Sequence, residues 1–353
     1  MTRKKGGTPE FRVGEWLRGT GPESDIAICT RVRLARNLQG YRFSACQSEA
    51  EARELVELVE RQLKTGFPEP LGIVDLETID DLERAILVER HLISKEMAAS
   101  KRARALATDT EESVAIMINE EDHLRSQVFA SGLQTEAVWK RAERLDDAIM
   151  QRLSLAWSEE LGFLTSCPTN TGTGMRLSIM LHLPGLVWSE EIEKATNTAQ
   201  KIHLAVRGLF GEGSRALGDF YQVSNQITLG RAETQIESEV GLAVKGIVNW
   251  ERDVREALLR GAARERTLDK VHRALGVVER ARILTSEEAM GCLSALRFGV
   301  NQGILDDFDV LAINRALLLS QPAHLQRFCG EIMGPAERDL RRAGVVREAL
   351  GLA

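Results

Sequence analysis

Short runs of apolar and β-branched residues alternate with long amphipathic stretches along this chain. The runs at 26–32, 113–118 and 219–229 predict strands. The segment 177–183 alternates Leu and Ile with Ser, Met and His, as a half-buried strand does. Long, uneven segments separate these strands, which favours an α+β fold with an antiparallel sheet flanked by helices over a doubly wound parallel sheet.

The first predicted helix has distinct start and stop signals. Ser48 is followed three residues later by Glu51, the spacing of a capping box, and Gly66 and Pro68 end the helix. Apolar residues at helical spacing predict further helices at 79–89, at 135–161, at 189–208 and from 234 to beyond 258.

From about residue 253 onward, Leu, Ala, Arg and Glu recur at helical spacing, with Gly or Pro at the breaks. This pattern predicts an additional C-terminal all-α domain. We therefore expect a loose N-terminal arm at 1–23, the α+β domain at 24–254 and the helical domain at 255–353.

Composition and charge narrow the class of protein. A formal net charge of -6 argues against general nucleic-acid binding. No apolar run reaches the ~18 residues of a membrane span, and the first residues are basic and polar rather than apolar. The five cysteines include no CxxC pair, so we expect a cytoplasmic protein without a membrane or nucleic-acid partner.

An acidic run, 119–123 (Asn-Glu-Glu-Asp-His), directly follows the strand predicted at 113–118. Titratable side chains at a strand end are typical of catalytic loops, and the alternative is a solvated acidic turn. Two more loops are candidates for chemistry. Cys167 lies in the loop 166–174, rich in hydroxyl and backbone N–H donors, although many such cysteines are merely buried. The glycine-rich loop 207–214 is either a mobile lid or phosphate cradle, or a plain connector, and it lacks the Lys-Ser/Thr of a P-loop.

Five arginines lie in or next to these strands and loops: Arg31, Arg33, Arg125, Arg176 and Arg207. Arg31 and Arg33 lie two apart and would share one face of a strand. If all five converged, their guanidinium groups would neutralise a triphosphate. The alternative is five unrelated surface arginines.

Four stretches resemble the catalytic domain of the phosphagen (guanidino) kinases, in that family's order. They are CTRVRLARN at 29–37, INEEDHLRSQ at 118–127, TSCPTNTGTGMR at 165–176 and RGLFGEGSRALGDFYQVSNQ at 207–226. The resemblance extends over roughly 24–254. It implies reversible transfer of the γ-phosphoryl group of ATP to a guanidinium nitrogen, with Mg²⁺ held mainly by phosphate oxygens and water rather than by protein ligands.

The resemblance also implies roles for individual residues. Glu121 and Glu212 would grip the substrate guanidinium from two sides, and Cys167 would lie beside it as a thiolate. This agrees with the chemistry, because a guanidinium has a pKa above ~12 and must lose a proton to become a nucleophile. The residues expected to bind ATP are Cys29, Thr30, Arg31, Val32, Arg33, His91, Arg125, Arg176, Leu177, Ser178, Ile179, Met180, Arg207, Gly208, Leu209, Phe210, Gly211 and Glu212. Cys29 departs from the family, which usually has Ser or Thr there.

Two features are similar to the bacterial protein-arginine kinases within this family. The first motif begins close to the start of the chain, without the helical domain that precedes it in kinases of small guanidines, and a helical domain follows instead. The resemblance implies arginine side chains of proteins as substrates. It also implies a homodimer, and functional links to the Clp protease machinery and a heat-shock repressor.

A C-terminal run matches the RDxxRA motif of those kinases, a regulatory phosphoarginine site. It would place Arg338, Asp339, Arg341, Arg342 and Ala343 around a phosphoarginine. Arginines on adjacent helical faces are able to pair with a phosphate, and the alternative is an ordinary solvated helix.

Two other functions stay open. The first is a kinase of free arginine or another small guanidine, which would turn over free arginine and not protein. The second is a phosphoarginine-binding adaptor with a vestigial kinase site, which would be unaffected by Glu121→Gln.

Overall fold

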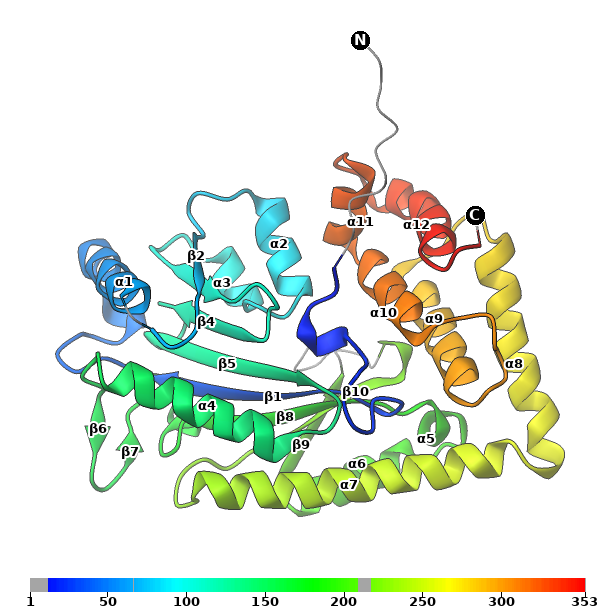
Figure 1. Cartoon of the computed structure of the whole chain (residues 1–353), viewed down its shortest axis with the longest axis horizontal. Coiled ribbons are helices and arrows are strands. Elements are labelled where there is room, and N and C mark those ends of the chain that lie inside the picture. The colour runs from blue at the N-terminus through cyan, green and yellow to red at the C-terminus, as the bar shows by residue number, and fades with distance from the viewer. Residues whose placement is uncertain (1–11, 66, 209–216, 353) are drawn as a thin grey trace, which may run out of the picture.

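The computed structural model describes residues 12–65, 67–208 and 217–352 (Figure 1). Its centre is an eight-stranded sheet in the order β2-β3-β4-β5-β1-β8-β10-β9, and every neighbouring pair is antiparallel. The strands are β1 Ala27–Arg36, β2 Gly72–Asp75, β3 Ala105–Thr108, β4 Val114–Ile118, β5 Leu124–Ser131, β8 Met175–His182, β9 Leu204–Gly208 and β10 Phe220–Asn225. A separate short hairpin pairs β6 (Trp157–Ser158) with β7 (Gly162–Phe163). The predicted antiparallel α+β fold is confirmed.

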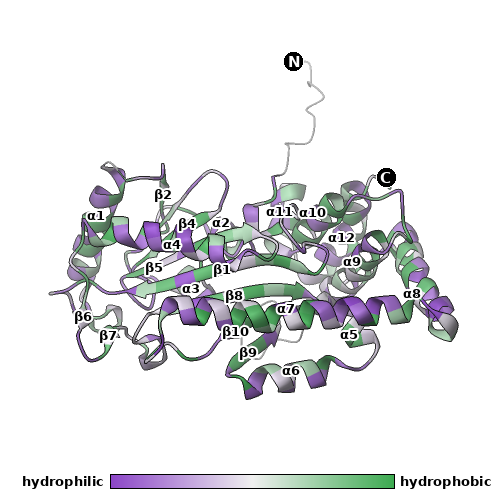
Figure 2. Cartoon of the chain, turned by 60° about the horizontal axis from the view of Figure 1, so that its bottom comes forward, coloured by the Kyte–Doolittle hydropathy of each residue, from purple (hydrophilic) through white to green (hydrophobic). Residues whose placement is uncertain are grey.

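Helices cover both faces of the sheet. In the main domain they are α1 Glu49–Lys64, α2 Asp81–Glu89, α3 Lys95–Ala99, α4 Thr135–Met150, α5 Pro184–Trp188, α6 Ile192–Lys201 and α7 Glu233–Leu258. Short 3-10 turns are η1 Glu15–Leu17, η2 Ser44–Cys46, η3 Pro168–Asn170 and η4 Leu217–Asp219. Figure 1 shows α4 and α7 beneath the sheet, and α2 and α3 above it. In Figure 2, α7 alternates purple and green, as an amphipathic helix does.

The helical C-terminal region follows as α8 Gly261–Arg280, α9 Ser286–Asn301, α10 Val310–Leu319, α11 Pro322–Cys329 and α12 Pro335–Ala349. It shares a buried core with the sheet, in which Trp16 and Phe220 pack with Leu293, Phe298 and Leu317. The boundary predicted between 254 and 255 falls inside α7, which runs unbroken from beneath the sheet towards α8.

The capping box at the start of α1 is confirmed. The Ser48 hydroxyl accepts a hydrogen bond from the Glu51 amide at 3.3 Å, and the Glu51 carboxylate accepts one from the Ser48 amide at 2.8 Å. Leu55 and Val59 are fully buried on the inner side of this helix. Local sequence signals alone were sufficient here, because both halves of the cap lie within one turn.

Two predicted helices were too long. Helix α4 ends at Met150, and the segment after it runs beside the end of β1, where the Ala156 amide donates to the Asn37 carbonyl at 2.7 Å. The helix predicted at 189–208 ends at Lys201, and its last residues form strand β9 against β10. In both cases pairing with a distant strand overrides the local helical spacing.

Strand β8 was predicted to be half-buried, and this was wrong. Both of its faces are covered: Ser178 and His182 are buried as fully as Leu177 and Ile179. At the end of the strand, the second face is covered by the C-terminal helical region, where His182 Nε2 lies 2.9 Å from the hydroxyl of Ser294 in α9. Within the described ranges, no helix has the length and apolar character needed to span a membrane.

Candidate active site

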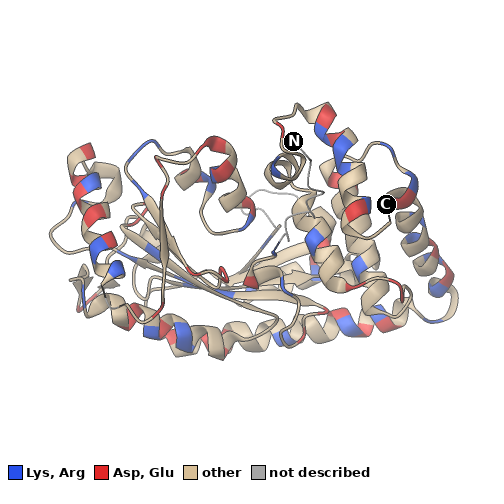
Figure 3. Ribbon diagram, turned by 45° about the horizontal axis from the view of Figure 1, so that its top comes forward, with Lys and Arg blue, Asp and Glu red and all other residues tan. Residues whose placement is uncertain are grey.

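The strand register gathers the predicted arginines on one face of the sheet. Arg33 of β1 is paired directly with Arg176 of β8. Ala35, two residues further along β1, is paired with Arg125 of β5. Directly paired residues point to the same side of a sheet, as do residues two apart on one strand, so Arg31 joins them. Figure 3 shows blue segments along the middle of the sheet, in agreement with this register.

Strands β9 and β10 extend the same face. Arg207 is paired with Gln222, which is paired in turn with Met180 of β8. The Gln222 side chain accepts a hydrogen bond from Arg31 Nη2 at 2.8 Å. Above this face lies a cavity of about 800 Å³, lined by Arg31, Arg33, Val88, His91, Ile93, Ser94, Lys95, Glu96, Met97, Ser100, Arg102, Met117, Asn119, Glu120, Glu121, Arg125, Gln127, Arg176, Arg207 and Gln222. All five predicted arginines therefore meet in one cavity.

This cavity holds more positive charge than its own acidic groups neutralise. Burial, reinforced by neighbouring guanidinium groups, lowers the pKa of Arg31 to about 10. The same causes lower the pKa of Arg33 well below its ordinary value, with Arg31, Arg125 and Arg176 as the neighbours. Among the described residues, the buried Nε of Arg33 has no hydrogen-bond partner. A half-buried cluster of cations with an unpaired donor is suited to a polyanion.

Of the two consecutive glutamates in the acidic run, Glu120 is fully engaged. Its carboxylate accepts from Arg125 Nη1 at 3.0 and 3.2 Å, from the Ser94 hydroxyl at 2.6 Å and from the Glu121 amide at 2.9 Å. Burial alone would raise the pKa of Glu120, but Arg125 and these hydrogen bonds outweigh it and lower the pKa. Glu120 thus anchors Arg125, a role that the sequence did not reveal.

The Glu121 carboxylate, unlike that of Glu120, is available to a ligand. In the described part of the chain it takes part in no hydrogen bond or ion pair. Burial, and then the neighbouring Asp122 carboxylate, raise the pKa of Glu121. A carboxylate with a raised pKa is a better proton acceptor than an ordinary one.

Asp122 joins the acidic run to the loop that carries Cys167. Its Oδ1 accepts from the Asn37 side chain and from the Ser166 amide, each at 2.7 Å. The Ser166 hydroxyl donates to the Glu121 carbonyl at 2.9 Å, so residues 121 and 166 are adjacent. Cys167 follows as a half-buried thiol, with its Sγ 3.0 Å from the Thr169 hydroxyl. It lies next to the cavity but is not part of its wall.

His123 is fully buried, and its ring holds neighbouring backbone segments together. Its Nδ1 accepts from the Leu38 amide at 2.9 Å, and its Nε2 lies 2.8 Å from the Arg42 carbonyl. Burial lowers the pKa of His123, which agrees with a neutral ring. Asp122 and His123 therefore hold the acidic run at its C-terminal end.

His91 lines the cavity next to the arginines. Burial, together with Arg31 and Arg33, lowers the pKa of His91 to about 3, so its imidazole is neutral. Its ring makes an edge-to-face contact with Trp16, with ring centroids 4.6 Å apart. Trp16 and Gln222 were not predicted from the sequence, because only the tertiary fold brings them beside His91 and Arg31.

The other residues expected to bind ATP are distributed over both faces of the sheet. Cys29, Ser178 and Met180 surround a small void beside Arg31, and burial raises the pKa of Cys29 to about 12. Thr30, Val32, Leu177 and Ile179 are fully buried. Val32, Leu177 and Ile179 belong to the core on the opposite, helix-covered face. Gly208 ends β9, whereas Leu209, Phe210, Gly211 and Glu212 lie outside the described residues.

The predicted phosphoarginine site lies on α12 and is split between surface and interior. Arg342 is buried: its Nε donates to the Ser320 carbonyl at 2.8 Å, its Nη1 donates to the Leu284 carbonyl at 2.7 Å, and it pairs with Asp339. Ala343 is also buried. Arg338 donates a hydrogen bond to the Met333 carbonyl at 3.3 Å. Arg341 is exposed and pairs with Glu331 at 2.8 Å. Arg342 and Ala343 therefore hold the helix in place, and only part of the motif faces outward.

Comparison with known proteins agrees with this geometry. The family described as "ATP:guanido phosphotransferase, C-terminal catalytic domain" matches residues 54–254. This chain belongs to the ATP:guanido phosphotransferase family. The domain described as "Protein-arginine kinase McsB C-terminal domain" matches residues 264–353, which contain α9 to α12.

The family membership extends over nearly the whole chain. It is 42% identical to the protein-arginine kinase of Symbiobacterium thermophilum over 339 residues, covering 95% of this chain and 96% of that protein. It is 40% identical to the protein-arginine kinase of Bacillus thuringiensis subsp. konkukian over 341 residues, 96% of each.

Solved structures of ATP:guanido phosphotransferases share the sheet and its helices. The duplicated taurocyamine kinase of Schistosoma mansoni, with bound transition state analog components, is similar with a TM-score of 0.61 and 26% identity, over 70% of this chain and 35% of that one. Lombricine kinase matches with a TM-score of 0.60 and 24% identity, over 71% and 72% of the two chains.

Proposed function

We propose that this protein is an ATP-dependent protein-arginine kinase. The observation that carries the proposal is the cavity of about 800 Å³, in which arginines from four strands lie together with the carboxylate of Glu121, which has no hydrogen bond or ion pair among the described residues. Such a cavity suits a polyanionic nucleotide at one end and a cationic guanidinium at the other. Relatives named protein-arginine kinase, similar over nearly the whole chain, support a protein arginine as the acceptor.

The five arginines are proposed to bind the ATP phosphates and the group in transfer. A guanidinium fork donates two parallel hydrogen bonds to phosphate oxygens, and Arg33 has a buried donor to contribute. Arginine offers no lone pair to a cation, so the cavity wall that binds phosphate does not itself suit Mg²⁺. We propose that Mg²⁺ enters on the ATP, bound mainly to phosphate oxygens and water.

Glu121 is proposed to orient the substrate guanidinium and to accept its proton. The N–P bond forms as the bond from the γ-phosphorus to the ADP oxygen breaks, and the guanidinium proton passes to the carboxylate. Cys167, joined to Glu121 through Ser166, would lie beside the guanidinium and help to orient it. Glu212 is proposed as the second carboxylate, from the glycine-rich loop.

The test is mass spectrometry at neutral pH after incubation with ATP, Mg²⁺ and an unfolded, arginine-containing protein. We expect acid-labile phosphate on arginine side chains, and little phosphorylation of free arginine in a parallel reaction. Rapid phosphorylation of free arginine alone would favour a kinase of small guanidines. No phosphorylation of either acceptor would favour a phosphoarginine-binding adaptor.

The outward-facing part of the α12 motif is proposed to bind phosphoarginine. Arg338 and Arg341 would contact the phosphate, while Asp339 pairs with Arg342 and keeps α12 in position. We expect Arg341→Ala to weaken binding of a phosphoarginine peptide about tenfold, the loss of one charge-assisted hydrogen bond. Fluorescence anisotropy of a labelled peptide measures this.

The matched control is Arg264→Ala, since the Arg264 side chain is 54% exposed and that of Arg341 is 56%. This control variant should bind the peptide like the wild type. Equal affinity in all three proteins would remove Arg341 from the site.

We propose a homodimer formed through the helical region. Three large apolar side chains of this region, Ile283, Ile332 and Leu340, are more than half exposed. Contiguous exposed apolar patches mark partner surfaces, and we propose that these three side chains contribute to one. Cytoplasmic location, and links to the Clp protease machinery and a heat-shock repressor, also belong to this proposal and rest on the family resemblance.

A further inference from the structure

The carboxylate of Glu89 caps a helix of the C-terminal region. Glu89 is the last residue of α2, and its two oxygens accept from the amides of Ala323 at 2.7 Å and His324 at 2.9 Å. These are N–H groups of the first turn of α11, which have no acceptor within that helix. His324 Nδ1 lies 2.6 Å from the same carboxylate. A carboxylate at a helix N-terminus is further stabilised by the helix dipole.

The segment 89–91, at the end of α2, also places His91 in the wall of the cavity. His91 follows Glu89 by two residues and adopts a left-handed backbone conformation with φ of 59°. Its amide donates to the Val88 carbonyl at 2.9 Å, and its carbonyl accepts from the Gln127 side chain at 2.9 Å. A non-glycine residue keeps such a conformation only where its surroundings hold it. The position of His91 therefore depends on how the end of α2 is anchored.

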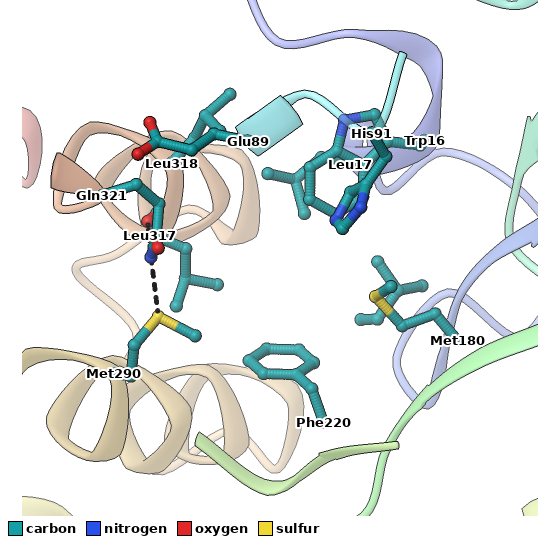
Figure 4. A pocket seen from close by; sticks show the side chains of 11 residues that line it. Trp16, Leu17, Glu89, His91, Met180, Phe220, Met290, Leu317, Leu318 and Gln321 are labelled. Atoms are coloured by element: carbon teal, nitrogen blue, oxygen red, sulfur yellow. Dashed lines mark hydrogen bonds between the residues drawn. The ribbon is translucent and has the colours of Figure 1, made fainter. Parts of the chain in front are cut away.

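The C-terminal region also supports the His91 ring from the other side. Trp16, which contacts the ring, packs in the core shared with α9 and α10, and the next residue, Leu17, accepts at its carbonyl from Asn314 Nδ2 of α10 at 2.9 Å. Figure 4 shows His91 beside Trp16, and Glu89 of the same segment close to Leu318 and Gln321. Both supports of His91 thus originate in α10 and α11.

We propose that Glu89 is a positioning residue, which ties helix α11 to the His91 end of the cavity and so sets its affinity for the nucleotide. The inference rests on the proposed function, because it takes that end of the cavity to bind ATP. A displacement of α11 would move Glu89, and with it His91, relative to Arg31 and Arg33. The helical region thereby acts on the cavity through the buried Glu89 contact, in addition to the support that Trp16 gives to the His91 ring.

A second contact between the same helices provides the comparison. Glu83 of α2 pairs with Arg327 of α11, but their side chains are 39% and 51% exposed. The side chains of Glu89 and His324 are 12% and 2% exposed. Exposed ion pairs contribute little, whereas hydrogen bonds from buried donors to a charged acceptor are stronger. The coupling should therefore pass through Glu89 and not through Glu83.

The experiment compares Glu89→Gln with Glu83→Gln in the full-length protein. Calorimetric titration with ADP and Mg²⁺ gives the Kd without turnover, and hydrogen exchange reports on the Ala323 and His324 amides. For Glu89→Gln we expect the Kd to rise about fivefold or more, with faster exchange at both amides. For Glu83→Gln we expect a Kd within about twofold of the wild type.

Each outcome decides between alternatives. Faster exchange with an unchanged Kd would overturn the inference, because Glu89 would then only hold α11. Failure of the wild type to bind ADP would overturn the proposed function itself. If Glu89→Gln does not fold, as judged by circular dichroism, His324→Leu removes only the side-chain contact; its Kd should still rise, and an unchanged Kd would again overturn the inference.

Discussion

Glu121→Gln is expected to lower kcat for arginine phosphorylation about 10²–10⁴-fold. The amide matches the carboxylate in size but accepts no proton and carries no charge to hold the guanidinium. The neighbouring Glu120 cannot take over this role, because Arg125, Ser94 and the Glu121 amide already occupy its oxygens. The measurement is the initial rate of phosphoarginine formation at saturating ATP and acceptor.

The control is Glu96→Gln, which removes one negative charge from the wall of the same cavity. Glu96, like Glu121, is exposed, so the loss of its charge alone is screened by water and salt, and we expect less than about a tenfold change. Equal losses in the two variants would mean that the cavity needs negative charge in general and not the carboxylate of Glu121.

If Glu121 accepts the guanidinium proton, kcat should depend on pH in a defined direction. The pKa of Glu121 is raised, so its carboxylate becomes protonated at a higher pH than an ordinary glutamate does. A protonated carboxyl group does not accept the guanidinium proton, so kcat of the wild type should fall on acidification while the pH is still above the ordinary range of a glutamate.

Arg297→Leu is expected to lower the free energy of unfolding by about 2–4 kcal/mol, through the loss of hydrogen bonds from a charged donor. Arg297 is fully buried in α9 and donates to the carbonyls of Asp25 at 2.9 Å and Ser24 at 2.5 Å. It also lies 3.1 Å from His182 Nδ1 and 3.3 Å from the Asn314 side chain. Leucine would remove the Arg297 donor from the Ser24 carbonyl and from the Asn314 side chain, in the contact between the sheet and the helical region, whereas the Asp25 carbonyl still accepts from Asn301 at 3.1 Å.

Burial, followed by the neighbouring Arg255, lowers the pKa of Arg297 to about 9, so the group still carries its charge at neutral pH. Guanidinium chloride unfolding at pH 7 measures the loss. Arg273→Leu, at a side chain that is 77% exposed on α8, should change the stability by no more than about 0.5 kcal/mol. A loss below about 1 kcal/mol for Arg297→Leu would show that the helical region docks mainly through its apolar core.

The sequence by itself determined those features whose signals are local. The capping box of Ser48 and Glu51, the strand of β4 and the helices after residue 253 were all predicted, because each depends on residues within a few turns of one another. The motifs around Glu121 and Cys167 identified the family for the same reason, because each motif consists of consecutive residues.

Only the tertiary structure decided what depends on pairing between distant segments. Strand β9 exists because β10 offers it a partner, and the arginines converge because the register aligns Arg33 with Arg176 and Ala35 with Arg125. The sequence did not distinguish Arg342, buried on main-chain carbonyls, from the exposed Arg341 beside it. Nor did it show Glu89 at the end of α11, because residues more than two hundred positions apart meet only through the fold. The sequence gives each side chain its charge and its hydrogen-bond donors and acceptors. The packing of distant segments decides which partner each of these groups meets.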